Sequence, residues 1–195
     1  MMKKLLILAL CLLLLCLCAC GPKVSKGDPF SYVVKEWHEK IKDDGEIYYD
    51  GVKLTAKYAL IDIDENGGKA LLLDRPWFYE VYTIQDGVAV LQQSFKDDPG
   101  GHGARLQKNG VIRVDKSQEK DGKVEIVDSF YRFENGELKL QAELIMGIGY
   151  CFHIPANGVE ISITREEYHQ LSLDYAGDDY KSPDLDWKPL AEYGR

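Results

Sequence analysis

Six of the Asx-Gly pairs in this chain constrain its fold more than any other feature of its sequence. They separate short segments rich in Val, Ile, Leu and Tyr, and each pair supplies the positive backbone dihedral angles that tight hairpin turns need. Apolar segments separated by such turns predict an antiparallel meander rather than alternating strands and helices. The pairs are Asp50-Gly51, Asn66-Gly67, Asp86-Gly87, Asn109-Gly110, Asp121-Gly122 and Asn135-Gly136.

The apolar segments predict the strands, and a helical pattern flanks them on each side. The first helix follows Asp28, with Pro29 at its first position, and is expected to end at Gly45. The second begins at the capping box of Thr164 and Glu167. We predict an α+β fold, in which an antiparallel β meander forms a curled sheet or partial barrel and packs against both helices. The predicted strands span residues 52–62, 70–74, 79–84, 88–95, 104–107, 111–115, 123–133 and 137–148.

The N-terminus has the pattern of an export signal. Lys3 and Lys4 precede an apolar run of about 13 residues, whereas a transmembrane helix needs roughly 20. The run ends in Leu17-Cys18-Ala19-Cys20, which resembles the lipobox of bacterial lipoprotein precursors. The alternative is a signal that is cut off and discarded. We expect a lipoprotein signal peptide over 1–19, the lipidated Cys20 with a short tether over 20–28, and one globular strand-rich domain over 29–195.

This organisation has consequences for location and partners. Two acyl chains on Cys20 would anchor the protein stably in a membrane. We therefore expect it at the outer face of the cytoplasmic membrane, with membrane lipid as its partner. Removal of the signal takes away two lysines and no acid, so the formal charge falls from −8 to −10. Such a charge disfavours nucleic acid as a partner. Cys151 is the single cysteine beyond Cys20, so the folded part has no intrachain disulfide.

Four short segments carry a resemblance to a known group of proteins. They span residues 58–67, 82–87, 163–168 and 186–190, from Tyr-Ala-Leu-Ile-Asp-Ile-Asp-Glu-Asn-Gly to Asp-Trp-Lys-Pro-Leu. Together they resemble a widespread group of uncharacterised secreted proteins and lipoproteins of Gram-positive bacteria. Members of that group usually show Pro-Glu-Leu after an aspartate-rich loop, where this chain has Lys69-Ala70-Leu71. The resemblance implies an exported location and a strand-rich fold, and it implies no activity.

The most specific local motif is an oxygen-rich loop. Asp62, Asp64 and Asn66 stand at positions one, three and five of a calcium loop, and the backbone carbonyl of Gly68 stands at position seven. Leu73 occupies position twelve, where a bidentate Glu belongs, so any calcium site here is weak. The alternative is a hairpin turn in which these side chains bond backbone amides. Beyond this possible calcium site, no cofactor is expected.

Three further groups of residues are candidates for chemistry. Cys151 and His153 point to one face of a predicted strand, either as a nucleophile and its base or as core residues, and burial is favoured. His102 and Arg105 lie near a glycine-rich stretch and are candidates for a small-anion site. The aromatic residues of Trp77-Phe78-Tyr79 suit either ligand stacking or core packing, and packing is favoured. Trp187, in a final extended piece, is expected to be buried.

No complete catalytic constellation emerges from these candidates. The sequence therefore favours a non-enzymatic, surface-tethered binding or interaction module of unknown ligand. Two alternatives remain open: a cell-envelope hydrolase that uses acids such as Asp62 and Asp64, and an accessory subunit or inhibitor of a membrane complex.

Overall fold

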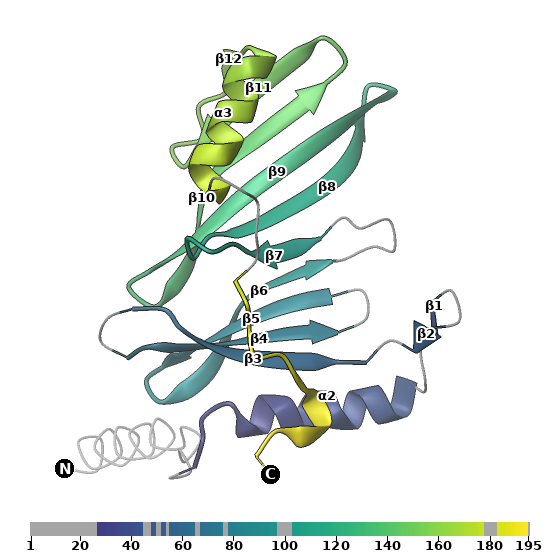
Figure 1. Cartoon of the computed structure of the whole chain (residues 1–195), viewed down its shortest axis with the longest axis vertical. Coiled ribbons are helices and arrows are strands. Elements are labelled where there is room, and N and C mark those ends of the chain that lie inside the picture. The colour runs from purple at the N-terminus through teal and green to yellow at the C-terminus, as the bar shows by residue number, and fades with distance from the viewer. Residues whose placement is uncertain are drawn as a thin grey trace, which may run out of the picture.

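The computed structural model describes residues 27–44, 48–49, 52–53, 55–64, 67–75, 78–96, 103–177 and 183–194. Strands dominate this part of the chain, with one helix before them and one after most of them (Figure 1). The helices are α2 (Ser31–Asp44) and α3 (Arg165–Ala176), and a short 3-10 helix, η1 (Leu190–Glu192), lies near the C-terminus. The strands are β1 (Tyr48–Tyr49), β2 (Val52–Lys53), β3 (Lys57–Asp62), β4 (Lys69–Arg75), β5 (Phe78–Gln85), β6 (Val88–Lys96), β7 (Ala104–Leu106), β8 (Ile112–Lys120), β9 (Lys123–Glu134), β10 (Glu137–Gly147), β11 (Tyr150–Pro155), β12 (Ile161–Ile163) and β13 (Lys188–Pro189).

Three of the Asx-Gly pairs form the hairpin turns that the sequence predicts. Asp86, Asp121 and Asn135 have φ angles of 51°, 52° and 52°, and the glycine after each also has a positive φ. Two successive positive φ angles match the right-handed twist of the flanking strands. These turns connect β5 to β6, β8 to β9, and β9 to β10, so the predicted antiparallel meander is confirmed.

Strands β3 to β13 divide into two open sheets, and β1 pairs with β2 in a separate two-stranded sheet. The first has the strand order β13-β3-β4-β5-β6 and the second the order β12-β11-β10-β9-β8-β7. The expected curled sheet or partial barrel is not found, because neither described sheet closes or curls strongly. The division falls between β6 and β7, where the sequence contains Pro99 and three glycines. Proline lacks the amide that a strand ladder needs and glycine is a weak strand former, which favours an end to pairing here.

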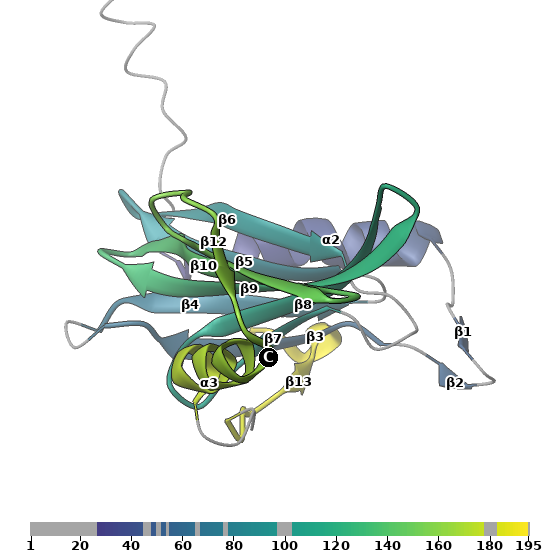
Figure 2. The same ribbon diagram turned by 90° about the horizontal axis from the view of Figure 1, so that it is seen from above.

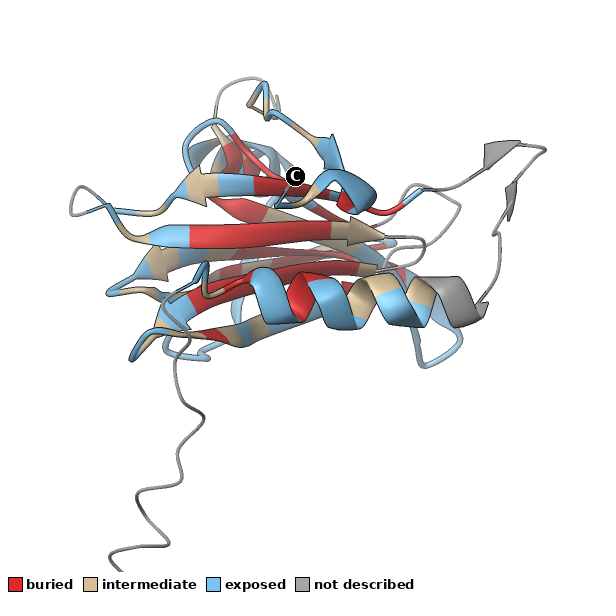
Figure 3. Ribbon diagram, turned by 90° about the horizontal axis from the view of Figure 1, so that it is seen from below, coloured by how far each residue is buried: buried red, intermediate tan, exposed pale blue. Residues whose placement is uncertain are grey.

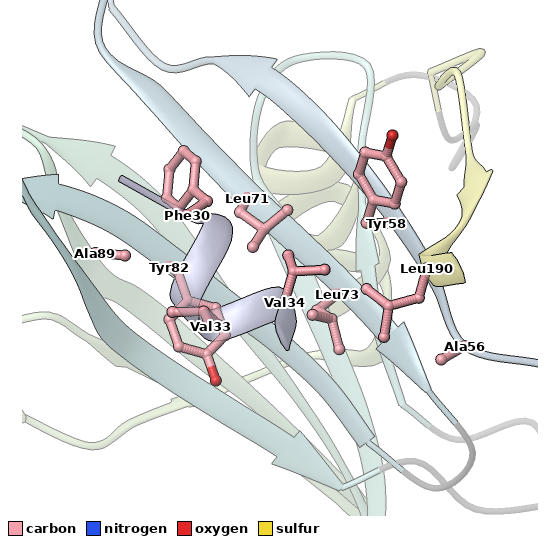
Figure 4. Packing of buried hydrophobic residues seen from close by; sticks show 10 residues of the cluster. All are labelled: Phe30, Val33, Val34, Ala56, Tyr58, Leu71, Leu73, Tyr82, Ala89 and Leu190. Carbon is pink, nitrogen blue, oxygen red and sulfur yellow. The ribbon is translucent and has the colours of Figure 1, made fainter. Parts of the chain in front are cut away.

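The elements stack in four layers, in the order α2, first sheet, second sheet and α3 (Figures 1 and 2). An apolar cluster lies between each pair of neighbouring layers. The first cluster joins Phe30, which directly precedes α2, and Val33 and Val34 of α2 to Leu71 and Leu73 of the first sheet (Figure 4). A second cluster lies between the sheets, and a third lies under α3. Buried residues accordingly follow the middles of the strands and one side of α2 (Figure 3).

The sheets also meet at one polar contact. The register of β5 and β6 shifts beside Gln92, which places one extra residue in β6. The Oε1 atom of Gln92 accepts a hydrogen bond from the backbone amide of Leu138 in β10 at 3.3 Å. This side chain therefore satisfies an amide of the second sheet from the edge of the first.

None of the helices in the described segments is both long and apolar enough to cross a bilayer.

Candidate functional site

A cavity of about 230 Å³ lies where both sheets meet the C-terminal segment. We call this cavity the seam cleft. Its walls combine two aromatic rings, aliphatic side chains, one acid and one base, which is the mixture that ligand pockets usually show. The lining residues are Asp74, Tyr79, Ala104, Arg105, Leu106, Leu185 and Trp187.

Strands β4 and β5 supply the first wall of the seam cleft. Asp74 and Tyr79 are direct cross-strand partners, so their side chains leave the sheet on the same side. That side is the one that faces the second sheet, because Leu72 and Val81 lie on it in the cluster between the sheets. The strand pairing therefore places an acid next to an aromatic ring at the edge of the core.

The C-terminal segment supplies the opposite wall. Lys188 pairs with Tyr58 of β3, and the amide of Leu190 donates to the carbonyl oxygen of Ala56, so this segment is held against the first sheet. Trp187 is only partly buried, and its ring centroid lies 6.3 Å from that of Tyr79 at an interplanar angle of 73°. The expected docking of this extended piece is confirmed, and its tryptophan keeps an exposed part at the cleft.

Arg105 borders the cleft from β7. Ala104 and Leu106 on either side of it are buried, whereas its own side chain is 55% exposed, so it leaves the strand on the opposite face. Its Nη1 atom lies 3.9 Å from a carboxylate oxygen of Asp115. His102, the other residue of the predicted small-anion site, lies outside the described residues.

A larger cavity of about 470 Å³ lies between α2 and the C-terminal turn. Asp28 bonds across it, because one carboxylate oxygen caps the amide of Phe30 and the other accepts from the hydroxyl of Tyr193. Burial, with the hydrogen bond to Asp28, raises the pKa of Tyr193. This cavity also contains Lys35, His38 and Glu39. The Tyr193 side chain is engaged in holding the chain ends together, so we favour the seam cleft as the ligand site.

The predicted calcium loop connects β3 to β4. Asp62 forms an ion pair with Lys69, and Asp64 accepts a hydrogen bond from the amide of Gly68 at 2.9 Å. These are contacts of the hairpin-turn alternative, and Asn66 lies outside the described residues. Among the residues that the structure describes, no cluster of three metal-ligating side chains occurs. Calcium binding at this loop stays a prediction.

Cys151 and His153 point to the face of β11 that α3 covers. The Cys151 thiol is buried in the cluster under α3, and burial raises its pKa, which disfavours the reactive thiolate. Burial lowers the pKa of His153, whose Nε2 atom lies 3.2 Å from the hydroxyl of Tyr175. The favoured reading of Cys151 as a core residue is confirmed.

Three buried carboxylates occur in the described segments, and each accepts a hydrogen bond from a tyrosine hydroxyl. Tyr82 donates to Glu80 at 2.7 Å. Tyr150 donates to Glu125 at 2.6 Å, and this bond with one from Gln118 lowers the pKa of Glu125. Tyr168 donates to Asp128 at 2.6 Å. Each buried carboxylate is thus satisfied by a hydrogen bond from a tyrosine hydroxyl.

Sequence reasoning identified parts of the seam cleft without assembling them. It singled out Tyr79, Arg105 and Trp187 for separate reasons, and it missed Asp74 as a site residue. Tyr79 and Trp187 come from segments about a hundred residues apart, so only the tertiary fold brings them together. The one available signal was a tryptophan in a polar C-terminal tail, where an isolated large ring needs a surface to pack on.

No family model matches the chain, no curated protein matches it, and no solved structure matches its fold. The function is therefore argued from this chain's own residues.

Proposed function

We propose that this protein is a membrane-anchored, extracytoplasmic lipoprotein whose folded part is a non-enzymatic binding module with the seam cleft as its ligand site. The lipid on Cys20 holds it at the outer face of the cytoplasmic membrane. The cleft itself is the observation that carries the binding role, because it places Asp74 beside the rings of Tyr79 and Trp187.

The arrangement of the chain ends supports the anchor. Asp28 bonds to Tyr193, so the start and the end of the described chain lie together beside α2, at the opposite end of the molecule from α3 (Figure 1). The tether from residue 21 to 27 spans about 25 Å at most, at roughly 3.6 Å per residue. An anchor at Cys20 therefore keeps the α2 end near the membrane and turns the second sheet outward.

The buried carboxylates and those of the β3–β4 hairpin are engaged in structural hydrogen bonds and ion pairs, which supports binding rather than catalysis. Glu80, Glu125 and Asp128 each accept from a tyrosine, and Asp62 and Asp64 bond within their hairpin. The seam cleft, in contrast, exposes part of the Trp187 ring and the charge of Arg105, which suit recognition of a ligand.

Cell fractionation tests the anchor. The wild-type chain is expected in the membrane fraction, with acylated Cys20 as the first residue by mass spectrometry. The Cys20→Ala variant is expected to lose acylation, whereas Cys18→Ala is the matched control and should keep it. An unacylated protein that begins downstream of residue 20 would contradict this part of the proposal.

Incubation with isolated cell-envelope material tests the binding role. The detergent-purified full chain should be retained on this material in a saturable way and should release no soluble fragments from it. A Trp187→Ala variant is expected to be retained less, while an Ile148→Ala variant, which alters an exposed residue of the β10–β11 turn, should behave as wild type. Steady release of fragments by the wild-type chain would instead favour the hydrolase alternative.

A further inference from the structure

We propose that the folded domain rests on the bilayer surface through an apolar patch of Tyr32, Ile84 and Leu91, which we call the anchor-side patch. The surface that it contacts is the headgroup and glycerol region of the membrane that holds Cys20. This inference rests on the lipid anchor of the proposed function, and it adds a second, non-covalent contact between the protein and the membrane.

Strand pairing places Ile84 and Leu91 on the face of the first sheet that carries α2. Leu91 is the cross-strand partner of Tyr82, and Ile84 is the cross-strand partner of Ala89. Both partners are buried in the cluster under α2, and cross-strand partners leave a sheet on the same side. Ile84 is nevertheless 37% exposed and Leu91 47% exposed. The two apolar side chains therefore lie on the helix side of the sheet but beyond the area that α2 covers.

Tyr32 extends this exposed apolar surface onto α2. Its hydroxyl donates to the carbonyl oxygen of Ala89 at 3.1 Å, so its side chain reaches across to β6. The residue is 52% exposed. Tyr32, Ile84 and Leu91 thus surround Ala89 and come from three different elements. Single exposed apolar residues are normal on a protein surface, whereas a group of them gathered at one place indicates contact with another apolar surface.

The patch lies where the lipidated tether enters the fold. Tyr32 is the second residue of α2, and Asp28, directly after the tether, caps the turn that precedes the helix. Phe30 of that turn packs in the same cluster as Ala89 (Figure 4). The tether from residue 21 to 27 spans about 25 Å at most. The bilayer therefore meets the patch at a high effective concentration, and a contact too weak to hold an untethered protein suffices.

The chemistry of the patch suits a bilayer surface. A tyrosine ring combines an apolar body with a polar tip, and such rings are enriched at the boundary between membrane and water. The charged residues that follow Tyr32 along the exposed side of α2 sum to zero, because Lys35 and Lys40 balance Glu36 and Glu39. This side of the helix does not share the net negative charge of the chain, so the contact is apolar and depends little on salt.

Leu60 provides a matched control on the same sheet face. It is the cross-strand partner of Leu71, which belongs to the cluster under α2, and it is 49% exposed. It lies on β3, whereas Leu91 lies on β6, and the two central strands β4 and β5 separate them. Leu60 therefore matches Leu91 in residue type, face and exposure, but it lies on the other flank of α2 and should not contact the bilayer.

Fluorescence quenching in vesicles tests the proposal. The acylated full chain is reconstituted into phosphatidylcholine vesicles whose acyl chains carry bromine, with an apolar fluorophore on Leu91→Cys. The buried Cys151 thiol should stay unlabelled, and acylated Cys20 has no free thiol. The label at Leu91→Cys should be quenched several-fold more strongly than the same label at Leu60→Cys. A label at Ile148→Cys, in the β10–β11 turn, should behave as in water.

A second substitution tests whether the patch holds the bilayer. Ile84→Ser in the labelled Leu91→Cys chain should lower the ratio of docked to undocked protein about fivefold, because it removes an apolar side chain from the contact. Leu60→Ser in the same labelled chain should change this ratio less than about twofold. Both substitutions replace exposed side chains, and thermal melting checks that the fold is kept.

The outcomes separate this inference from the anchor on which it rests. A chain that mass spectrometry shows to be unacylated at Cys20 would overturn the anchor and this inference together. An acylated chain with equal quenching at Leu91→Cys and Leu60→Cys would overturn only the inference. Equal quenching at Leu91→Cys and Ile148→Cys would show that the anchored domain has no preferred face and would overturn it as well. Disulfide formation between two unlabelled Leu91→Cys chains, without quenching of the label, would assign the patch to a second copy of the chain instead of the bilayer.

Discussion

Each of the two helices contacts its sheet through a group that contains a carboxylate, a tyrosine and an arginine, but the two groups are arranged differently. Under α2, Glu80 accepts from Tyr82 and from Arg75, and all three residues belong to the sheet. The helix reaches this group only through Trp37, whose Nε1 atom donates to the Tyr82 hydroxyl at 3.0 Å. The Arg75 guanidinium carbon also lies 3.9 Å from the centroid of the Trp37 ring.

Under α3, the helix itself supplies the tyrosine. The Tyr168 hydroxyl donates directly to Asp128 of β9, and Arg113 of β8 donates to the same carboxylate through Nε at 3.0 Å and Nη2 at 2.8 Å. The buried side chains of α3 are otherwise small, namely Ser172 and Ala176.

The comparison shows two ways to dock a helix. Helix α2 buries Val33 and Val34, together with Phe30 directly before it, and each such side chain contributes roughly 1.5–3 kcal/mol. Its polar contacts, from Trp37 to Tyr82 and from Tyr32 to the carbonyl oxygen of Ala89, add to that burial. Helix α3 buries less apolar surface and depends on the Tyr168–Asp128 bond and on its N-terminal capping box. We therefore expect polar substitutions to release α3 more readily than α2.

The largest expected effect comes from Asp128→Ala. The substitution leaves Tyr168 without its acceptor and takes two hydrogen bonds from Arg113, whose side chain is only 24% exposed. Breaking such a pair from one side costs about 3 kcal/mol or more. Urea denaturation measures the loss. The control Asp174→Ala, on the exposed face of α3, should cost about 0.5 kcal/mol or less, and equal losses in both variants would contradict the expected role of Asp128.

A pair of tyrosine variants tests the comparison directly. Tyr168→Phe and Tyr82→Phe each remove one hydroxyl that donates to a buried carboxylate, at a cost of about 1.5–3 kcal/mol. Hydrogen exchange should rise over residues 165–176 in Tyr168→Phe, because that bond holds the helix. It should stay low over residues 31–44 in Tyr82→Phe, because apolar burial still holds α2. Comparable opening of both helices would break the comparison.

The sequence predicted the local structure well because local signals determine it. Asx-Gly pairs specify hairpins through backbone dihedral angles alone, and Asp86, Asp121 and Asn135 adopt the expected left-handed conformation. Thr164 and Glu167 form the predicted capping box, with both reciprocal bonds present. The helix predicted after Asp28 also packs on the meander as expected, with Val33 and Val34 in the core.

The sequence did not predict what depends on contacts between distant segments. The division into two sheets follows from which strands pair, and strand patterns alone fit one continuous sheet equally well. The seam cleft requires β4, β5, β7 and the C-terminal segment to meet, and no local pattern connects Asp74 with Trp187. Strand β12 was also missed, because its three residues are too few to show an alternating pattern.

A smaller effect is expected from the helix cap. The Thr164 hydroxyl accepts from the amide of Glu167 at 3.1 Å, so Thr164→Ala leaves that amide without its partner and costs about 1 kcal/mol. Thr164→Ser keeps the hydroxyl and should restore most of the stability. Thermal melting followed by circular dichroism measures both variants. A loss in Thr164→Ala that serine fails to rescue would show that the methyl group, rather than the cap, stabilises this end of α3.

The smallest expected effect is a difference between the helices at acid pH. Hydrogen bonds from Thr164 lower the pKa of Glu167 below its usual value of 4.5. A carboxyl whose pKa is lower in the folded state than in the unfolded state stabilises the fold above its unfolded pKa, and this contribution disappears as the pH falls through the folded pKa. The first turn of α3 should therefore loosen below about pH 4.5, whereas α2 has no acid in its first turn and should not follow. Amide chemical shifts of Thr164 and Glu167 measured from pH 6 to pH 3 report this change, and Glu167→Gln should remove its pH dependence. Parallel loosening of α2 over the same range would show that the acid effect is global and would remove this distinction between the two helices.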